Sequence, residues 1–178
     1  MVDISNKRLN ELKKGFEGKR IAVVGDMMLD GYFWGDVKRI SPEDPVPVLE
    51  VEDEFFRFGG AASVAYNILT LGGVPVPVGV IGNDNYGSVF SSLIKDKNIK
   101  NDGIIIDNER PTTTKTRVIA NSQHVVRIDK ESKAYINNKI ESKISSYLES
   151  TIDKLDGIIL QDYNKGILTP SLITKIIA

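Results

Sequence analysis

A double glycine followed by an apolar helical run constrains the fold of this chain more than any other stretch. Gly59-Gly60 is followed by small residues, and glycine lets the backbone come close to a neighbouring group. Val64, Ile68 and Leu71 then recur at the spacing of one helix face. The run stops at Gly72-Gly73, a helix C-terminal signal. Such a turn presents free N–H groups to a polar or anionic ligand, but the pattern fits a tight turn before a packed helix equally well.

Apolar strand-like runs alternate with amphipathic helical runs along the rest of the chain. Strands are predicted at 20–25, 75–81, 102–106 and 157–160, and helices at 61–71, 86–97 and 137–151. This alternation is typical of βαβ units around a parallel sheet. A helix at 5–17, with Ser5 as its N-cap, is expected to pack on the domain surface, and Thr169-Pro170 begins a last helix. The fourth strand, at 157–160, is expected to be buried like the others.

Two further stretches predict a smaller β-structure beside the sheet. Residues 31–58 are rich in aromatic residues and prolines, and 46–51 reads as an edge strand because prolines flank it. Residues 115–120 and 124–129 read as a hairpin closed by Asn121-Ser122-Gln123. His124 is the only histidine, and its place at a strand start favours a surface or packing role over a catalytic one.

Composition excludes several classes of function. The net charge is −1 and no dense Lys/Arg run occurs, which argues against a nucleic-acid-binding face. The absence of cysteine excludes a disulfide, a thiol nucleophile and a cysteine-based zinc site, and it fits a cytoplasmic location. No apolar run reaches the roughly 18 residues needed to cross a membrane. The charged N-terminus is unlike a signal peptide.

The stretch around Gly59 resembles the N-terminal signature of the ribokinase-like (PfkB) carbohydrate kinases. The glycines and small residues of that signature fall in register here, at Gly59, Gly60, Ala62, Ala65, Gly72 and Gly82. Ser63 stands where the family pattern has an asparagine that is expected to hydrogen-bond the sugar. Four other segments resemble the heptose 7-phosphate kinase domain of ADP-heptose synthesis enzymes, namely 23–30, 39–48, 114–118 and 162–166.

The resemblance implies an α/β, ribokinase-like fold, with a mostly parallel sheet flanked by helices and a small β-lid built from about 31–58 and 112–130. It implies transfer of the ATP γ-phosphate to a sugar or sugar phosphate, with the anomeric hydroxyl of heptose 7-phosphate as the expected acceptor. It places Asp30, Gly59, Gly60 and Ser63 around the sugar. Lys115, Arg117, Asp162 and Lys165 are the candidates for its phosphate, with Arg127 as a further one. The alternative for each charged residue is a helix or turn cap, or a solvated side chain.

The sequence carries no recognisable catalytic half. There is no G-x-x-x-x-G-K-[ST] loop, and the only Gly-Asp pairs, Gly25-Asp26 and Gly35-Asp36, do not fit the late Gly-x-Gly-Asp motif that holds the family's catalytic aspartate. Residues 1–178 are therefore expected to form the N-terminal part of one kinase domain, truncated before its ATP-binding half, with the catalytic base after residue 178. ATP and Mg²⁺ would serve the complete enzyme, and no metal site is expected in this chain.

Three further expectations follow. The chain alone is expected to be inactive, and its sheet to end in an open, apolar edge at the fourth strand. A homodimer through the β-lid is expected, because lids of this family often form dimer interfaces. The rival functions are a non-catalytic sugar-phosphate-binding or dimerisation module and a dinucleotide-binding oxidoreductase, the latter disfavoured because the G-x-G-x-x-G spacing is absent.

Overall fold

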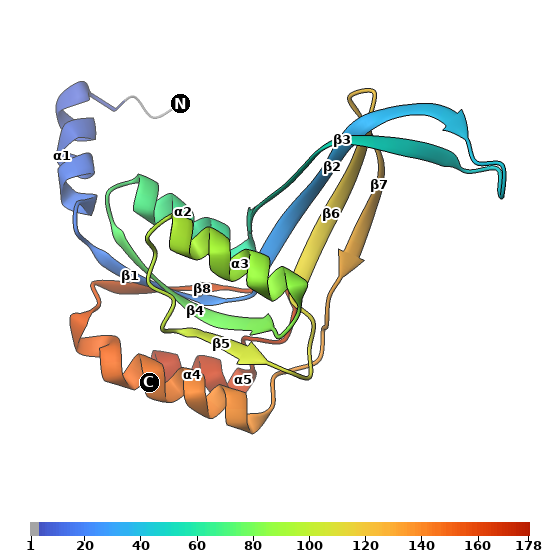
Figure 1. Cartoon of the computed structure of the whole chain (residues 1–178). Helices are drawn as coiled ribbons and strands as arrows, with labels where there is room; N and C mark the ends of the chain where they lie inside the picture. The colour runs from blue at the N-terminus through green and yellow to red at the C-terminus, as the bar shows by residue number, and fades with distance from the viewer. Residues whose placement is uncertain (1–3) are drawn as a thin grey trace.

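The computed structural model describes residues 4–178 as two four-stranded sheets with five α-helices (Figure 1). The first sheet is parallel and contains, in spatial order, β5 (Ile104–Asp107), β4 (Val74–Gly82), β1 (Arg20–Gly25) and β8 (Gly157–Gln161). Helices α2 (Gly60–Thr70) and α3 (Asn85–Asp96) cover one face, and α4 (Asn138–Thr151) and α5 (Pro170–Ile177) cover the other. The predicted α/β architecture, a parallel sheet flanked by helices with a smaller β-structure beside it, is confirmed.

The second sheet rises from the first as an arm, which we call the lid (Figure 1). Its strands, in spatial order, are β3 (Pro47–Gly59), β2 (Met27–Ile40), β6 (Thr113–Ala120) and β7 (Gln123–Lys130). β2 runs parallel to β6, while β3 and β7 pair antiparallel on the outside. The chain enters the lid directly after β1 and returns through Gly59 into α2, so the lid and the sheet meet at the carboxyl end of β1.

The core lies on both faces of the parallel sheet. Val23 and Val24 are successive residues of β1, and both are completely buried, one on each face. Val24 packs with residues of α4 and α5, whereas Val23 packs with residues of α2 and α3. Burial on both faces is the reason why this strand is continuously apolar rather than alternating.

Two prolines occupy an interior strand of the sheet at positions where they cost no ladder hydrogen bond. Pro75 and Pro77 lie in β4, opposite Ile21 and Val23 of β1. β4 pairs with β5 only from Gly79 onward, so the outer side of the first half of β4 needs no N–H donors. The predicted strand at 75–81 therefore forms despite its prolines.

Side-chain caps mark the helix starts, including those predicted at Ser5 and Thr169. Ser5 caps α1 (Asn6–Phe16), Asp84 caps α3 and Thr169 caps α5, each side chain accepting a hydrogen bond from a backbone N–H of the first turn. Pro170 occupies the first turn of α5, where no N–H is needed.

The lid strands are longer than the sequence predicted. The edge strand expected at 46–51 is the first part of β3, which continues to Gly59 against the whole of β2. Its charged middle, Glu52-Asp53-Glu54, hides the strand pattern. In the β6–β7 hairpin the turn is shorter than predicted, because Asn121 and Ser122 alone adopt positive φ and Gln123 already belongs to β7.

Two expectations about packing were wrong. Helix α1 forms as predicted, but none of its residues is buried, and Leu9 and Phe16 are 41% and 47% exposed. The helix stands away from the layers because the chain turns at Gly18 directly into β1 (Figure 1). Strand β8 was expected to be buried, yet Ile159 is 36% exposed, because β8 lies at the edge of the sheet.

The outer side of β8 carries the expected apolar edge. A cavity of about 540 Å³ opens beside β8, between the C-terminal ends of α1 and α2, and its lining is mainly apolar, including Phe16, Ile21, Ile68, Leu71 and Ile158. Among residues 4–178, no strand pairs with that side of β8. Over the same residues, none of the helices is long and apolar enough to span a membrane.

A buried carboxylate, that of Glu141, links α4 to α5, and its hydrogen bonds should make the folded state less stable in acid. Glu141 accepts hydrogen bonds from Thr169 Oγ1 and Ser171 Oγ, both at 2.7 Å, and from Lys175 Nζ at 2.9 Å. These bonds lower the pKa of Glu141 from its ordinary value of 4.5 to about 2. Because the folded pKa is the lower one, the contribution is complete above pH 4.5 and is lost as the pH falls toward 2.

We therefore expect Glu141→Gln to lower the free energy of unfolding at pH 7 by about 2–3 kcal/mol and to flatten its dependence on pH in the acid range. Urea unfolding measured from pH 7 down to pH 3 tests this. Glu149→Gln, an exposed change on the same helix, is the control and should match the unaltered chain. An unchanged acid slope in Glu141→Gln would contradict the assignment.

Candidate functional site

A buried aspartate at the carboxyl end of β1 holds the loop that follows β8. Asp26, which is 1% exposed, accepts hydrogen bonds from the backbone N–H groups of Tyr163, Lys165 and Ile167 at 2.7, 3.2 and 3.4 Å. Burial raises the pKa of Asp26, and the three backbone hydrogen bonds oppose that rise. This carboxylate is therefore committed to shaping the loop.

The same loop is held from its other side by an arginine. The Arg110 Nη2 atom donates to the backbone oxygens of Lys165 at 2.6 Å and of Ser132 at 3.3 Å. Burial lowers the pKa of Arg110, while the charges of Asp107 and Asp26 favour its ionised form. Lys165 thus has its N–H bound by Asp26 and its carbonyl bound by Arg110, which fixes where its side chain starts.

The predicted sugar-binding acid lies against the predicted glycine. Asp30 is on β2, and its Oδ1 atom accepts a hydrogen bond from Arg117 Nη1 at 2.7 Å. A Cβ added to Gly59 would come within 2.9 Å of Asp30 Oδ2, so a larger residue there would push against this carboxylate. The structure brings Asp30, Gly59 and Arg117 together at the base of the lid.

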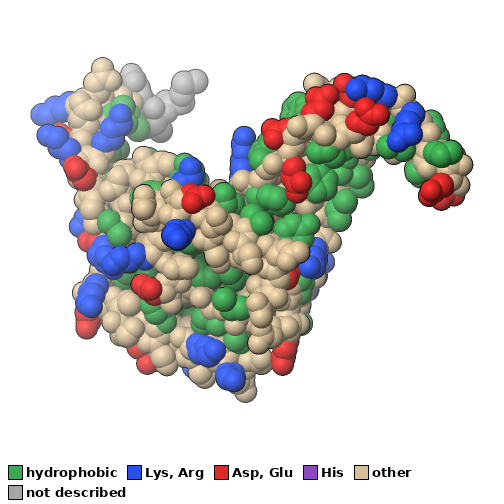
Figure 2. Space-filling model, in the orientation of Figure 1, with side chains coloured by type: hydrophobic (Ala, Val, Ile, Leu, Met, Phe, Trp, Pro, Cys, Tyr) green, Lys and Arg blue, Asp and Glu red, His purple; other side chains and the backbone are tan. Residues whose placement is uncertain are grey.

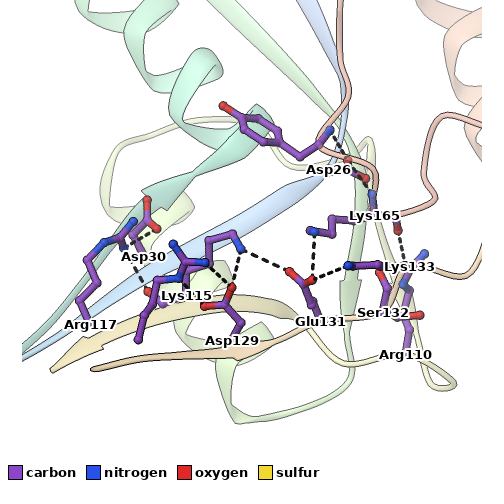
Figure 3. A network of polar contacts seen from close by, with 12 residues as sticks. Asp26, Asp30, Arg110, Lys115, Arg117, Asp129, Glu131, Ser132, Lys133 and Lys165 are labelled. Atoms are coloured by element: carbon purple, nitrogen blue, oxygen red, sulfur yellow. Dashed lines mark hydrogen bonds and ion pairs between the residues drawn. The ribbon is translucent and has the colours of Figure 1, made fainter. Parts of the chain in front are cut away.

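A chain of alternating charges continues from the lid to the loop after β8 (Figure 3). Lys115 Nζ lies 2.9 Å from Asp129 Oδ2 and 3.3 Å from Glu131 Oε2. Lys165 Nζ lies 3.0 Å from Glu131 Oε1. The structure therefore places Lys115 and Lys165 on either side of one carboxylate, although one belongs to β6 of the lid and the other to the loop after β8, 50 positions apart in the sequence.

The remaining predicted residues have other surroundings. Gly60 adopts a φ of 53°, and a Cβ there would lie 2.4 Å from the backbone oxygen of Asp26. Ser63 is half-buried in the first part of α2, and its side chain forms no hydrogen bond within residues 4–178. The Asp162 carboxylate accepts from Asn164 N at 2.7 Å, which matches the capping alternative.

Two outer lid residues are exposed. Arg127 Nε donates a hydrogen bond to Asp129 Oδ1 at 2.7 Å. His124 lies on the exposed strand β7.

Sequence reasoning missed the acids that accompany the predicted cations. Asp129 lies directly opposite Lys115 in the β6–β7 ladder, and Glu131 follows the end of β7. A bulge between Val118 and Ile119 shifts the register, so counting back from the turn would pair Lys115 with the wrong residue. Arg110 gave no signal either, because its partners are backbone carbonyls in two distant loops.

The sequence pattern of the pfkB family carbohydrate kinases matches residues 19–167, which include both sheets and the polar residues described above. The chain belongs to this family. Among its pfkB relatives is the bifunctional protein HldE of Helicobacter pylori strain HPAG1, which is 45% identical over 159 residues. That alignment covers 89% of this chain and 34% of the relative, so the chain spans about a third of the length of this relative.

Solved structures share the pfkB fold at low sequence identity. A carbohydrate kinase from Agrobacterium tumefaciens has a TM-score of 0.61 at 16% identity, over 89% of this chain and 48% of that one. Phosphofructokinase-2 from Escherichia coli, in complex with fructose-6-phosphate, has a TM-score of 0.62 at 16% identity, over 90% of this chain and 50% of that one. In both cases the likeness covers about half of the larger protein.

Proposed function

We propose that this chain is the substrate-binding half of an ATP-dependent carbohydrate kinase that phosphorylates a sugar phosphate, with heptose 7-phosphate as the expected substrate and its anomeric hydroxyl as the acceptor. The observation that carries the proposal is the juxtaposition of Asp30, Gly59 and Arg117 beside the lysines of the lid and loop. The heptose assignment rests on the resemblance of segments 23–30, 39–48, 114–118 and 162–166 to heptose 7-phosphate kinase domains, and the 45% identity with HldE supports it. A cytoplasmic location belongs to the same proposal.

The proposed roles follow from the chemistry of each group. The Asp30 carboxylate can accept hydrogen bonds from adjacent sugar hydroxyls, and Gly59 leaves space beside it. Lys115, Arg117 and Lys165 offer ammonium and guanidinium donors to a phosphate. Gly60 shapes the turn beneath the sugar, while Ser63 and Asp162 complete the proposed site from α2 and from the loop after β8.

The described residues do not fit a metal site. Within residues 4–178, no three His, Cys, Asp or Glu side chains are grouped to hold a metal ion. We assign ATP and Mg²⁺ to the complete enzyme, together with a catalytic base after residue 178, because the resemblance to the carbohydrate kinases implies them. No step of the proposed reaction runs through a metal held by this chain.

The substitution that tests the sugar site is Asp30→Asn. We expect it to weaken the affinity for heptose 7-phosphate by roughly 10- to 100-fold, because hydrogen bonds to a charged acceptor contribute about 1.5–3 kcal/mol. Asp53→Asn, a change of the same kind on the exposed part of β3, is the matched control. Calorimetric titration measures both, and equal affinities in the two variants would overturn the role of Asp30.

A turnover assay tests whether this chain contains catalytic groups of its own. Purified residues 1–178, given ATP, Mg²⁺ and heptose 7-phosphate, should form no ADP above the background rate. The same chain should show a rise in melting temperature with heptose 7-phosphate. Sugar-dependent ADP formation by this chain would mean that its own residues supply the base and would refute the division between two halves.

We also propose that the lid forms a homodimer interface. Val126 and Ile128 of β7 are 51% and 53% exposed, and their cross-strand neighbours Val118 and Thr116 lie on the same face. Figure 2 shows hydrophobic side chains gathered on the lid. An exposed apolar face on a sheet is typical of a partner surface.

Sedimentation tests the dimer. Ile128→Glu should weaken dimerisation by about 100-fold or more, because it buries a charge within the interface. Ser122→Glu at the hairpin turn is the control and should leave the dimer intact. A monomer at all concentrations of the unaltered chain would refute the interface.

A further inference from the structure

Glu131 lies among the ammonium groups of three lysines (Figure 3). Its Oε2 atom is 3.3 Å from Lys115 Nζ, and its Oε1 atom is 3.0 Å from Lys165 Nζ and 3.9 Å from Lys133 Nζ. Lys115 belongs to the lid, whereas Lys165 belongs to the loop after β8. One carboxylate therefore neutralises cations from both sides of the proposed phosphate site.

The cluster is sheltered enough for its charges to matter. The side chains of Glu131, Lys115 and Lys165 are 17%, 19% and 12% exposed, far less than the surface pair Lys38–Glu50 at 60% and 47%. Burial by itself raises the pKa of Glu131, but the hydrogen bonds from Lys165 and Lys115 outweigh it and lower the pKa. The carboxylate is thus ionised near neutral pH, with Asp129 as the second acid on Lys115.

We infer that Glu131 is an internal anion that competes with the phosphate of the ligand for Lys115 and Lys165 and so lowers the affinity of this site for a phosphorylated sugar, an inference that rests on the function proposed above. A neutral sugar offers nothing that can replace a carboxylate between two ammonium groups. A phosphate carries about −1.5 to −2 charges and three acceptor oxygens, so it can displace the Glu131 carboxylate.

The lysines suit this exchange. Each ammonium group is a rotatable point charge on a flexible four-carbon stem, so it can leave Glu131 for a ligand without movement of the backbone. The backbone of Lys165 is meanwhile held by Asp26 and Arg110, which keeps the start of its side chain in place. Arg117 is bound to Asp30 and lies outside the exchange.

The experiment compares heptose 7-phosphate and unphosphorylated heptose by calorimetric titration of the chain. Glu131→Gln should bind heptose 7-phosphate about tenfold more tightly than the unaltered chain, since removal of the competing charge frees both lysines. Its affinity for unphosphorylated heptose should not change. Glu131→Asp keeps the charge on a shorter side chain, so its affinity for heptose 7-phosphate should lie between those of the unaltered chain and Glu131→Gln. Glu50→Gln removes a negative charge from a lid pair away from the site and serves as the control.

Lysine variants separate the failure of this inference from the failure of the proposed site. If Lys165→Met loses heptose 7-phosphate binding while Glu131→Gln and Glu131→Asp bind as well as or worse than the unaltered chain, the site stands and the internal competitor is refuted. If Lys115→Met and Lys165→Met both bind like the unaltered chain, the phosphate site itself is wrong, and the role of Glu131 is refuted with it. Melting temperatures of all the variants confirm that each is folded.

Discussion

Replacement of Asp26 with alanine is expected to lower the free energy of unfolding by about 3–5 kcal/mol, the largest effect of any single change in the site. The substitution leaves three backbone N–H groups, those of Tyr163, Lys165 and Ile167, without their acceptor in a buried place. Each such group costs about 1–3 kcal/mol, and the relief of a buried charge recovers only part of that loss.

Urea unfolding of Asp26→Ala measures the effect, with Asp162→Ala as the matched control. Asp162 belongs to the same loop but is exposed and accepts a single backbone hydrogen bond, from Asn164 N, so its loss should cost less than about 1 kcal/mol. Equal stabilities of the two variants would show that Asp26 does not hold the loop.

Gly60→Ala is expected to destabilise the chain by about 3 kcal/mol or more through two separate terms. The φ of Gly60 is +53°, a left-handed conformation that costs a residue with a Cβ about 1–2 kcal/mol. The added Cβ would also lie 2.4 Å from the backbone oxygen of Asp26. That oxygen cannot easily yield, because it accepts a hydrogen bond from Ala61 N at 2.9 Å.

Gly18→Ala isolates the conformational part of this effect. Gly18 also has a left-handed φ, +71°, but a Cβ there would meet nothing within 4 Å. Chemical denaturation should therefore show a loss of about 1 kcal/mol for Gly18→Ala and a clearly larger loss for Gly60→Ala. Equal losses at the two glycines would mean that close approach to Asp26 plays no part.

Local signals in the sequence predict the parallel sheet and its helices well. The apolar run at 20–25, the caps at Ser5 and Thr169, and the glycines around α2 each specify an element within a few residues. The limits of the lid were harder to predict, because an exposed strand such as β3 carries charges that resemble those of a loop. The unpacked α1 could not be foreseen, since an amphipathic pattern shows that a face is apolar and does not show what covers it.

The sequence predicts the cations and glycines of the candidate site. It does not predict the groups that hold them in place. Asp30, Gly59, Lys115, Arg117 and Lys165 were predicted because segments around them resemble pfkB motifs, and the structure brings them together at the base of the lid. The partners Arg110 and Glu131 depend on the three-dimensional meeting of loops 108–112, 131–136 and 162–167. No pattern in the sequence shows that these three loops lie together in the folded chain.

The most direct test of the central claim, that the base of the lid binds a sugar phosphate, is to map heptose 7-phosphate onto the chain by backbone amide chemical shifts in NMR. The account predicts that the largest changes fall at Asp30, Gly59, Lys115, Arg117 and Lys165, with none around the apolar cavity beside β8. Changes centred on that cavity, or no change at millimolar ligand, would contradict the site and with it the proposed function.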